Sequence, residues 1–367
     1  MKTSATITFH ASHNYGSSLQ TYALQKTIQN LGLKNEIINF RTDRQKDMYS
    51  VLTKRKGVKY ALKNLTHILY YKPLCKKHEK FEKFIKENLV TTNEISNFEQ
   101  LKIECQGYDY YVAGSDQIWN PCPADFDWSY FLGFAQDGVK ISYAASFGPF
   151  AKPDQDTHFK IKNLLSDFKN VSVRESASQS VISELFNNEV EVVCDPTLLL
   201  DAKSWHELSK DGIHLERDYI LFYTLLADKE MLKMAKILSK KLKLPIVVTN
   251  FTNQYDVING FIKKYNCGPK DFLALIEKAK FVLTSSFHGT VFSIIFQKPF
   301  FSIRGMKDER ISTLLKNFGF ENRAVDINNV ADKVKTAYEI DFSNSQKIQN
   351  ELKEQGINFL KKSLELI

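Results

Sequence analysis

The chain alternates short apolar runs with longer amphipathic stretches almost from end to end. Residues 108–115 and 280–284 are runs of the kind found in strands buried on both faces of a parallel sheet. Residues 18–32 and 268–279 instead space their apolar side chains as one face of a helix. This alternation predicts an α/β protein in which polar loops follow the strands at the carboxyl edge of each sheet.

The same pattern divides the chain into two halves. In the first half we expect strands at residues 5–9, 35–40, 108–115, 140–148, 170–175 and 190–196, with helices at 18–32, 93–105, 156–168 and 176–186. In the second we expect strands at 219–226, 245–250, 280–284 and 299–303, with helices at 228–242, 268–279 and 308–319 and an apolar helix between the last two strands. The predicted domains are residues 1–197 with a basic helical insertion at about 54–90, residues 198–340, and a helical tail at 341–367.

Composition is that of a globular protein. The 367 residues are 43% hydrophobic and 25% charged, and no apolar run approaches the length of a membrane-spanning helix or of a signal peptide. The five cysteines are odd in number and widely spaced, with no CxxC pair. We therefore expect a cytoplasmic protein without a disulfide framework or a structural zinc site.

One segment carries most of the positive charge. Residues 54–86 contain 11 Lys and Arg against 2 Glu, a balance of +9 (11 − 2), whereas the whole chain has a net charge of +8. Aromatic and aliphatic residues interleave with these lysines, as in amphipathic helices at anionic membranes. The segment predicts contact with an anionic membrane or glycan, or else a solvated helical hairpin whose apolar side packs on its own domain. No nucleic-acid-binding signature is present, so nucleic acid is not an expected partner.

Two polar motifs follow strands in the first half. The motif at residues 14–17 places a glycine, which lets a ligand approach the backbone, between short polar side chains just before a helix. The motif at residues 114–117 places a carboxylate directly after a buried strand, where it could accept a hydroxyl proton. An ordinary helix cap or turn explains either motif equally simply. The residues concerned are Asn14, Tyr15, Gly16, Ser17, Gly114, Ser115, Asp116 and Gln117. Trp119, just beyond them, fits the core or a wall better than a platform for a sugar.

Two further motifs offer groups that bind or protonate an anion. Arg174 stands where a strand gives way to a helix, and its planar fork suits a carboxylate or phosphate, or a structural salt bridge with Glu175 or Asp195. His288 opens a helix after a polar turn, where backbone N–H groups favour anions and an imidazole can act as acid or base. The other residues of this second motif are Ser285, Ser286, Gly289 and Thr290.

Patterns for several common cofactors are missing. The sequence has no P-loop, no GxGxxG and no HExxH or grouped acids, so we expect neither nucleotide cradling by these motifs nor a bound metal.

Several motifs in one order resemble the polysaccharide pyruvyl transferase family. They are NYGSSLQTYALQ, GSDQIWNP, SYAASFG, SVRE, CDPTLLL and TSSFHGTVFSIIFQKPFFSI, and the resemblance runs from about residue 6 to about residue 322. It implies a fold similar to GT-B glycosyltransferases, with two Rossmann-like domains facing a cleft. It also implies transfer of pyruvate from phosphoenolpyruvate onto two hydroxyls of a sugar as a cyclic ketal.

The resemblance assigns roles to the motif residues. Asp116 and His288 become the candidate acid and base, without a decision on which is which. The N-terminal motif residues, Trp119 included, would bind the acceptor, a sugar of a cell-surface polysaccharide or its lipid-linked precursor. Arg174 and the residue 285–290 turn would bind phosphoenolpyruvate, with Arg304 and Arg310 as further cations. Many family members carry an acid after the glycine where this chain has Ser17 and Ser18, so that function is lost or moved to Asp116.

Two other functions remain open at this point. A GT-B nucleotide-sugar glycosyltransferase also holds its donor at helix starts of the C-terminal domain. A noncatalytic glycan-binding protein on the same fold is the second alternative. The expected location is the cytoplasm, at the inner face of the cell membrane if the basic segment binds lipid.

Overall fold

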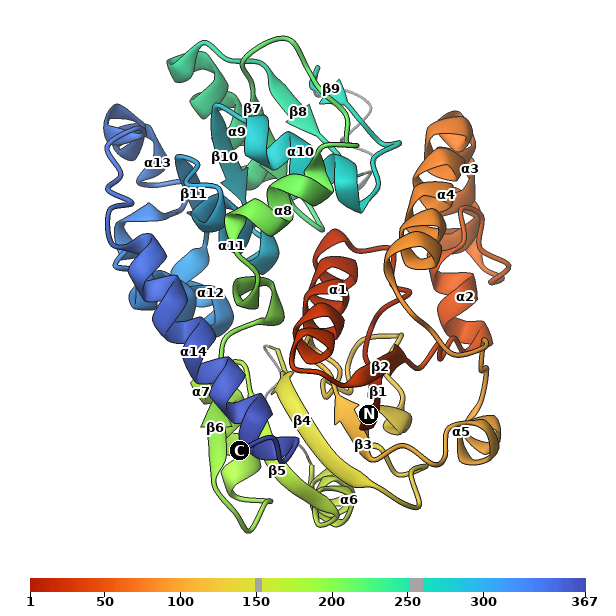
Figure 1. The fold of residues 1–367 in the computed structure, drawn as a ribbon. Coiled ribbons are helices and arrows are strands. Elements are labelled where there is room, and N and C mark those ends of the chain that lie inside the picture. Colours follow the sequence, from red (N-terminus) through yellow and green to blue (C-terminus); the bar gives the residue numbers. More distant parts are fainter. Residues whose placement is uncertain (149–153, 251–259) are drawn as a thin grey trace. The chain divides into compact units, whose positions relative to one another are not determined.

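A computed structural model describes residues 1–148, 154–250 and 260–367. Its contacts divide the chain into two compact units (Figure 1). The first unit comprises residues 1–54, 82–200 and 350–367, and the second comprises residues 55–81 and 201–349.

The first unit is built on a six-stranded parallel sheet in the order β2-β1-β3-β4-β5-β6. The strands are β1 Thr3–Ile7, β2 Lys34–Ile37, β3 Tyr110–Ala113, β4 Val139–Ala145, β5 Phe168–Val173 and β6 Val190–Val192. The helices are α1 Tyr15–Asn30, α2 Asp43–Tyr49, α5 Phe98–Glu104, α6 Gln155–Leu165 and α7 Ser176–Ser183, joined by the later part of α4 Tyr71–Asn88 and of α14 Ser345–Ser363. Because the chain leaves β1 toward β2 and returns to the other side as β3, the topological switch point lies between β1 and β3.

The second unit holds another six-stranded parallel sheet, in the order β12-β11-β10-β7-β8-β9. Its strands are β7 Ile220–Tyr223, β8 Ile246–Val248, β9 Ile262–Lys263, β10 Phe281–Thr284, β11 Phe300–Ile303 and β12 Ala324–Val325. Its helices are α3 Val58–Leu69, α8 Ala202–Ser209, α9 Lys229–Leu242, α10 Pro269–Lys278, α11 Phe287–Ile295, α12 Glu309–Phe318 and α13 Val330–Lys333. This is the strand order of Rossmann folds, and its switch point lies between β7 and β10.

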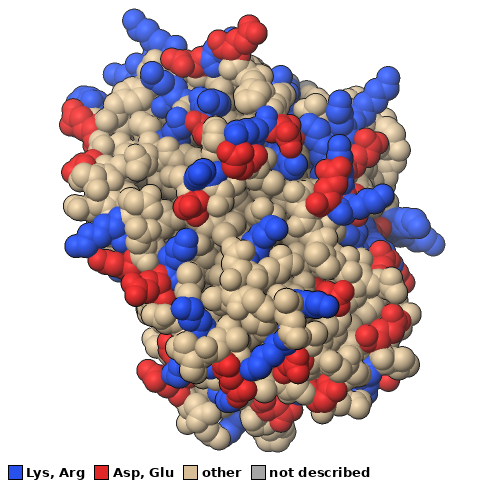
Figure 2. All heavy atoms as spheres, in the orientation of Figure 1, with Lys and Arg blue, Asp and Glu red and all other residues tan. Residues whose placement is uncertain are grey.

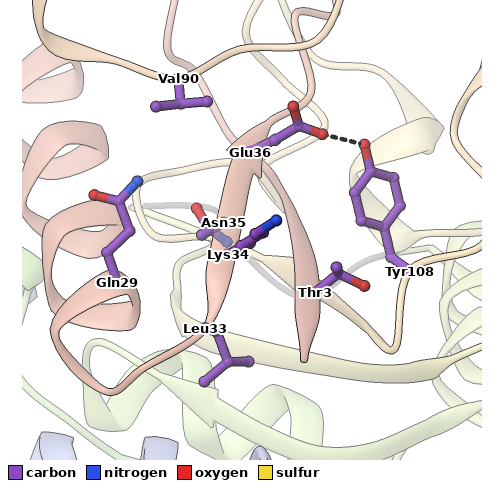
Figure 3. Close-up of a pocket in the computed structure, with 8 residues that line it drawn as sticks. All are labelled: Thr3, Gln29, Leu33, Lys34, Asn35, Glu36, Val90 and Tyr108. Atoms are coloured by element: carbon purple, nitrogen blue, oxygen red, sulfur yellow. Dashed lines mark hydrogen bonds between the residues drawn. The ribbon is translucent and has the colours of Figure 1, made fainter. Parts of the chain in front are cut away.

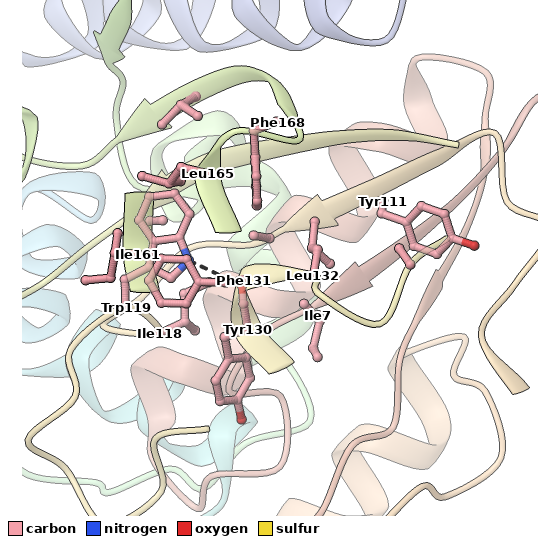
Figure 4. Packing of buried hydrophobic residues seen from close by; sticks show 14 of the residues in the cluster. Ile7, Tyr111, Ile118, Trp119, Tyr130, Phe131, Leu132, Ile161, Leu165 and Phe168 are labelled. Atoms are coloured by element: carbon pink, nitrogen blue, oxygen red, sulfur yellow. Dashed lines mark hydrogen bonds between the residues drawn. The ribbon is translucent and has the colours of Figure 1, made fainter. Parts of the chain in front are cut away.

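Aromatic side chains fill the core of the first unit (Figure 4). Trp119 is fully buried, stacks on Phe131 with ring centroids 5.0 Å apart, and donates its indole N–H to the Tyr130 carbonyl at 3.2 Å. Apolar burial of this kind is the dominant favourable contribution to folding. Trp119 is therefore part of the core, which is one of the alternatives that the sequence left open.

Two segments group differently from the expected domain boundaries. Residues 55–81 of the basic insertion join the second unit, where Lys80 pairs with Asp271 at 2.6 Å and Tyr70 packs on Tyr265. Residues 350–367 of the tail join the first unit, where Gln355 donates to the Val192 carbonyl at 3.1 Å and Phe359 is buried. Sequence order alone does not reveal such returns of the chain.

Candidate functional site

The two N-terminal motifs meet at the switch point of the first unit. Ser17, near the start of α1, donates its hydroxyl to Asp116 Oδ2 at 2.5 Å, and Asp116 lies three residues after the end of β3. The two residues are 99 positions apart in the chain. The resemblance linked an acid missing at Ser17 and Ser18 to Asp116, and the structure places Ser17, one of these two residues, in direct contact with Asp116.

Asp116 has an unusual backbone conformation. Its φ is 77°, in the left-handed region that non-glycine residues rarely adopt. A hydrogen bond from the Gln117 amide to Asp116 Oδ1 at 2.9 Å holds the carboxylate in place. Strained residues of this kind concentrate at functional sites, where the strain fixes a side chain in one direction.

Arg174 lies in a buried cluster of carboxylates. It follows β5, its side chain is 2% exposed, and Nη1 donates to Asp195 Oδ2 at 2.8 Å. Nε is 3.6 Å from Glu175 Oε2, and Nη2 is 3.7 Å from Asp116 Oδ1. Burial lowers the pKa of Arg174, but the three carboxylates more than offset this, so the pKa is raised above its usual value. The fork of Arg174 is thus directed at protein carboxylates, which include both salt-bridge partners that the sequence offered.

The same cluster is hydrogen bonded on its outer side. Asp195 accepts from the amide and the hydroxyl of Thr197 at 3.0 and 2.7 Å. Glu175 accepts from the Ser146 hydroxyl at 2.7 Å and from the Ser178 hydroxyl. Arg174 and its partners therefore form one network that ends at Asp116.

The remaining N-terminal candidates have structural contacts of their own. Asn14 caps α1 by accepting from the Gly16 amide at 3.0 Å, and Tyr15 is 1% exposed. Ser115 donates to Asp195 at 3.4 Å, so it belongs to the network. A Cβ on Gly114 would lie 3.1 Å from side-chain atoms of Leu24 and Thr6, so close packing of α1 on the sheet requires a small residue there.

One acid near Asp116 was missed by the sequence reasoning. Asp125 is 7% exposed and accepts a hydrogen bond from Tyr49. Burial raises the pKa of Asp125 above its usual value, and the charge of Asp116 adds to the effect. Two nearby carboxyls with different environments are a common way to provide one acid and one base. No strand or motif pointed to Asp125, because it lies in an irregular loop.

The C-terminal motif lies at the switch point of the second unit. Thr224, after β7, and Ser285, after β10, share a hydrogen bond of 2.6 Å between their hydroxyls. Ser286 caps α11 by accepting from the Gly289 amide at 3.4 Å. His288 is the second residue of α11 and is 7% exposed. A hydroxyl hydrogen bond thus lies at the switch point of each unit, and Asp116 takes part in the first bond, whereas His288 lies three residues after Ser285 of the second.

Gly289 and Thr290 turn toward the interior of the second unit. A Cβ on Gly289 would lie 2.3 Å from Thr284 Oγ1, so the glycine lets α11 pack closely on β10. The sequence reasoning assigned this glycine to close approach of a ligand. Thr290 is fully buried, and its hydroxyl donates to the Ser286 carbonyl at 3.1 Å.

Both C-terminal arginines pair with carboxylates of their own unit. Arg304 directly follows β11 and donates to Asp228 at 2.8 Å and to Glu230 at 2.5 Å. Arg310 binds Asp308 through both Nε and Nη2, at 3.0 and 2.5 Å. Much of their positive charge is therefore balanced within the fold.

A lysine from the basic segment reaches the same sheet edge. Lys77, on α4, donates to Asn250 Oδ1 at 2.7 Å, and Asn250 donates to the Thr224 carbonyl at 3.2 Å. Burial lowers the pKa of Lys77 to about 8, so it is mostly charged at neutral pH. Sequence reasoning grouped Lys77 with a surface charge run and gave no sign of this position.

A pocket of the first unit lies away from these motifs (Figure 3). Its volume is about 450 Å³, and its lining includes Thr3 and Lys34 at the amino ends of β1 and β2, Glu36 on β2, and Tyr108 just before β3. Tyr108 donates to Glu36 at 2.6 Å. Ligands of open α/β sheets bind at the opposite, carboxyl ends of the strands. None of the predicted site residues lines this pocket.

Comparison with known sequences gave one family and one relative. The family model described as polysaccharide pyruvyl transferase matches residues 14–305, a range that contains every motif on which the resemblance rested. General stress protein 30 of Bacillus subtilis (strain 168) is 28% identical over 153 residues. That match spans 40% of this chain and 40% of the relative.

Comparison with solved structures identifies the fold. The MnaA–UDP co-structure from S. aureus has a TM-score of 0.58 at 14% identity, covering 100% of this chain and 98% of that one. UDP-N-acetylglucosamine 2-epimerase from Rickettsia bellii has a TM-score of 0.55 at 9% identity, covering 100% and 98%. The Neisseria meningitidis UDP-GlcNAc 2-epimerase bound to UDP-GlcNAc has a TM-score of 0.54 at 11% identity, covering 99% and 100%. The predicted GT-B-like fold with two Rossmann-like units is thereby confirmed.

Proposed function

Because the chain belongs to the polysaccharide pyruvyl transferase family, we propose that it transfers pyruvate from phosphoenolpyruvate to a sugar as a cyclic ketal. The family makes the protein a transferase with a sugar or polysaccharide acceptor. The observation that carries the finer proposal is the placement of the family motifs at both switch points, with Asp116 at one and His288 at the other. Ligands of open α/β sheets bind at such points.

The reaction forms two bonds from sugar oxygens to C2 of phosphoenolpyruvate and adds one proton to the methylene carbon. One sugar hydroxyl attacks C2 of phosphoenolpyruvate, the methylene carbon takes up a proton, and the bond from C2 to the phosphate oxygen breaks. A second hydroxyl then closes the ketal on C2. The two hydroxyl protons are accounted for by the new methyl group and by the released phosphate.

The first unit is proposed to take the acceptor. Asp116 is fixed by Ser17, by the Gln117 amide and by its backbone conformation. A carboxylate held in this way can accept the proton of an attacking hydroxyl, a step that typically contributes 10²- to 10⁴-fold in rate. Arg174 acts in this proposal as a positioning residue, because its charge is directed at Asp116, Glu175 and Asp195.

The second unit is proposed to take phosphoenolpyruvate. The start of α11 offers backbone N–H groups to an anion, and His288 offers an acid or hydrogen-bond donor beside them. Lys77 adds a positive charge near this turn, to which it is linked by hydrogen bonds through Asn250 and Thr224. Phosphate and carboxylate are both satisfied by such donors, so the proposal requires no metal or organic cofactor.

Titration calorimetry with phosphoenolpyruvate and with UDP-, GDP- and CMP-sugars tests the donor. Binding of phosphoenolpyruvate, weakened in His288→Gln, supports the proposal. Binding of a nucleotide sugar in its place would identify the glycosyltransferase alternative. Saturable glycan binding with no bound donor would identify the glycan-binding alternative.

The acceptor is proposed to be a cell-surface polysaccharide, such as a capsule or exopolysaccharide, or its lipid-linked precursor. Phosphoenolpyruvate is a metabolite of the cytoplasm, so we place the reaction there, at the inner face of the membrane where a lipid-linked precursor would be met. In the described residues, no helix combines the length and apolarity needed to cross a bilayer.

A further inference from the structure

Helix α3 exposes its apolar side. Val58, Leu62, Leu65 and Leu69 repeat at helical spacing and are 87%, 54%, 61% and 69% exposed, and Ile68 beside them is 57% exposed. We call these five residues the α3 apolar face. A helix of a globular protein normally turns such a face toward the core.

The polar side of the same helix is the more protected one. Lys63, Asn64 and His67 are only partly accessible, although they are the residues that water would solvate best. The expected packing of an apolar side on its own domain is therefore not observed for α3, although α4 does bury its apolar residues Phe81 and Phe84. Leaving five large apolar side chains in water is unfavourable, so the face is suited to a partner.

The charge around the face indicates which partner. Residues 54–78 contain eight Lys and Arg and no Asp or Glu. Among them, Lys56, Lys72 and Lys76 are exposed. In Figure 2, blue atoms gather over the part of the surface where Figure 1 draws α3 and α4. A second copy of this face would bring like charges together, whereas an anionic lipid surface would neutralise them.

We propose that the α3 apolar face docks on a bilayer rich in anionic lipid. The helix lies along the surface, its apolar residues enter the boundary between headgroups and acyl chains, and the surrounding lysines contact lipid phosphates. This inference rests on the surface of α3 and does not depend on pyruvyl transfer, so either proposal can fail while the other stands.

Cosedimentation with phosphatidylglycerol and phosphatidylcholine vesicles tests the apolar part. The wild-type protein is expected to bind the anionic vesicles, and Leu62→Ser with Leu65→Ser should weaken binding about tenfold or more. The control is Ile103→Ser with Phe159→Ser, which removes two side chains that are 79% and 67% exposed on other helices. An equal loss in the control would overturn the assignment to α3.

A second set of variants tests the electrostatic part. Replacing Lys56, Lys72 and Lys76 by Gln should weaken binding roughly 100-fold at low salt, because each cation near an anionic surface contributes about fivefold. The remaining binding should depend less on salt. The control replaces exposed lysines of α9, Lys233, Lys236 and Lys240, by Gln and should leave binding nearly unchanged.

A direct probe separates insertion from simple adsorption. In Leu65→Trp, tryptophan emission should shift to shorter wavelength with phosphatidylglycerol vesicles and stay unchanged with phosphatidylcholine. Equal binding to both vesicle types, binding to neither, or cosedimentation without this shift would overturn the proposal. So would a wild-type dimer in light scattering that the Leu62→Ser, Leu65→Ser variant abolishes, since the partner would then be a second copy.

Discussion

Removing the charge of Arg174 should destabilise the first unit strongly. Arg174→Met keeps much of the length of the side chain but leaves Asp195, Glu175 and Asp116 without their shared cation. The Arg174 side chain is 2% exposed and those of Asp195 and Glu175 are fully buried, so water cannot replace the lost interaction. Breaking a buried ion pair by removing one partner costs about 3–5 kcal/mol.

The expected change in melting temperature follows from that range. For a domain of this size each 1 kcal/mol lowers Tm by about 2–4 °C, so Arg174→Met should lower Tm by roughly 6–20 °C. Arg174→Lys keeps the charge but loses the planar fork, so its Tm should lie between those of Arg174→Met and the wild type. Differential scanning calorimetry measures the Tm of both variants, and urea unfolding measures their free energy of unfolding.

A matched control separates burial from the mere loss of an ion pair. Arg310 pairs with Asp308 near the surface, with side chains 15% and 27% exposed. Arg310→Met should therefore change the free energy of unfolding by only about 1 kcal/mol. If Arg174→Met melts at the wild-type temperature and only the KM for phosphoenolpyruvate rises, Arg174 is a donor clamp and the structural reasoning is wrong.

Three further predictions concern proton transfer, donor binding and pH. His288→Gln should lower kcat by about 100-fold or more in an assay of phosphate release, and unchanged turnover would remove His288 from the mechanism. Lys77→Met should raise the KM for phosphoenolpyruvate about tenfold, or roughly 1.4 kcal/mol, with a smaller effect on kcat; a KM equal to wild type would show that Lys77 is structural only. Burial, with Arg41 nearby, lowers the pKa of His10 from 6.5 to about 4. The folded state then keeps His10 neutral where the unfolded state is protonated, so stability should fall as pH decreases from 6.5 to 4, by on the order of 3 kcal/mol for this group. In urea unfolding of His10→Gln, the free energy of unfolding should change less between pH 6.5 and 4 than in the wild type. The same pH dependence as in the wild type would show that His10 is not the group responsible.

Local pattern was enough to predict most of the elements. The strand expected at 280–284 is β10 Phe281–Thr284, and the helix expected at 228–242 is α9 Lys229–Leu242. Strands β9 and β12 were missed because each is only two residues long, too short to show a period.

Contacts between distant residues could not be predicted in the same way. The Ser17–Asp116 bond depends on strand order, which places β3 beside β1. The sequence offered Arg174 two salt-bridge partners and a ligand, and only the tertiary structure shows its three carboxylates. In α3, periodicity reveals two faces but not that the apolar one is exposed, because that depends on what packs against the helix.

The most direct test of pyruvyl transfer is detection of the product on an acceptor. Phosphoenolpyruvate labelled with ¹³C at C2 would be incubated with galactose-, mannose- and N-acetylhexosamine-bearing acceptors, and the products examined by NMR. The proposal predicts a labelled ketal carbon on one acceptor, phosphate released in equal amount, and loss of both signals in His288→Gln. Phosphate release without label on any acceptor, or transfer of a sugar from a nucleotide donor, would contradict it.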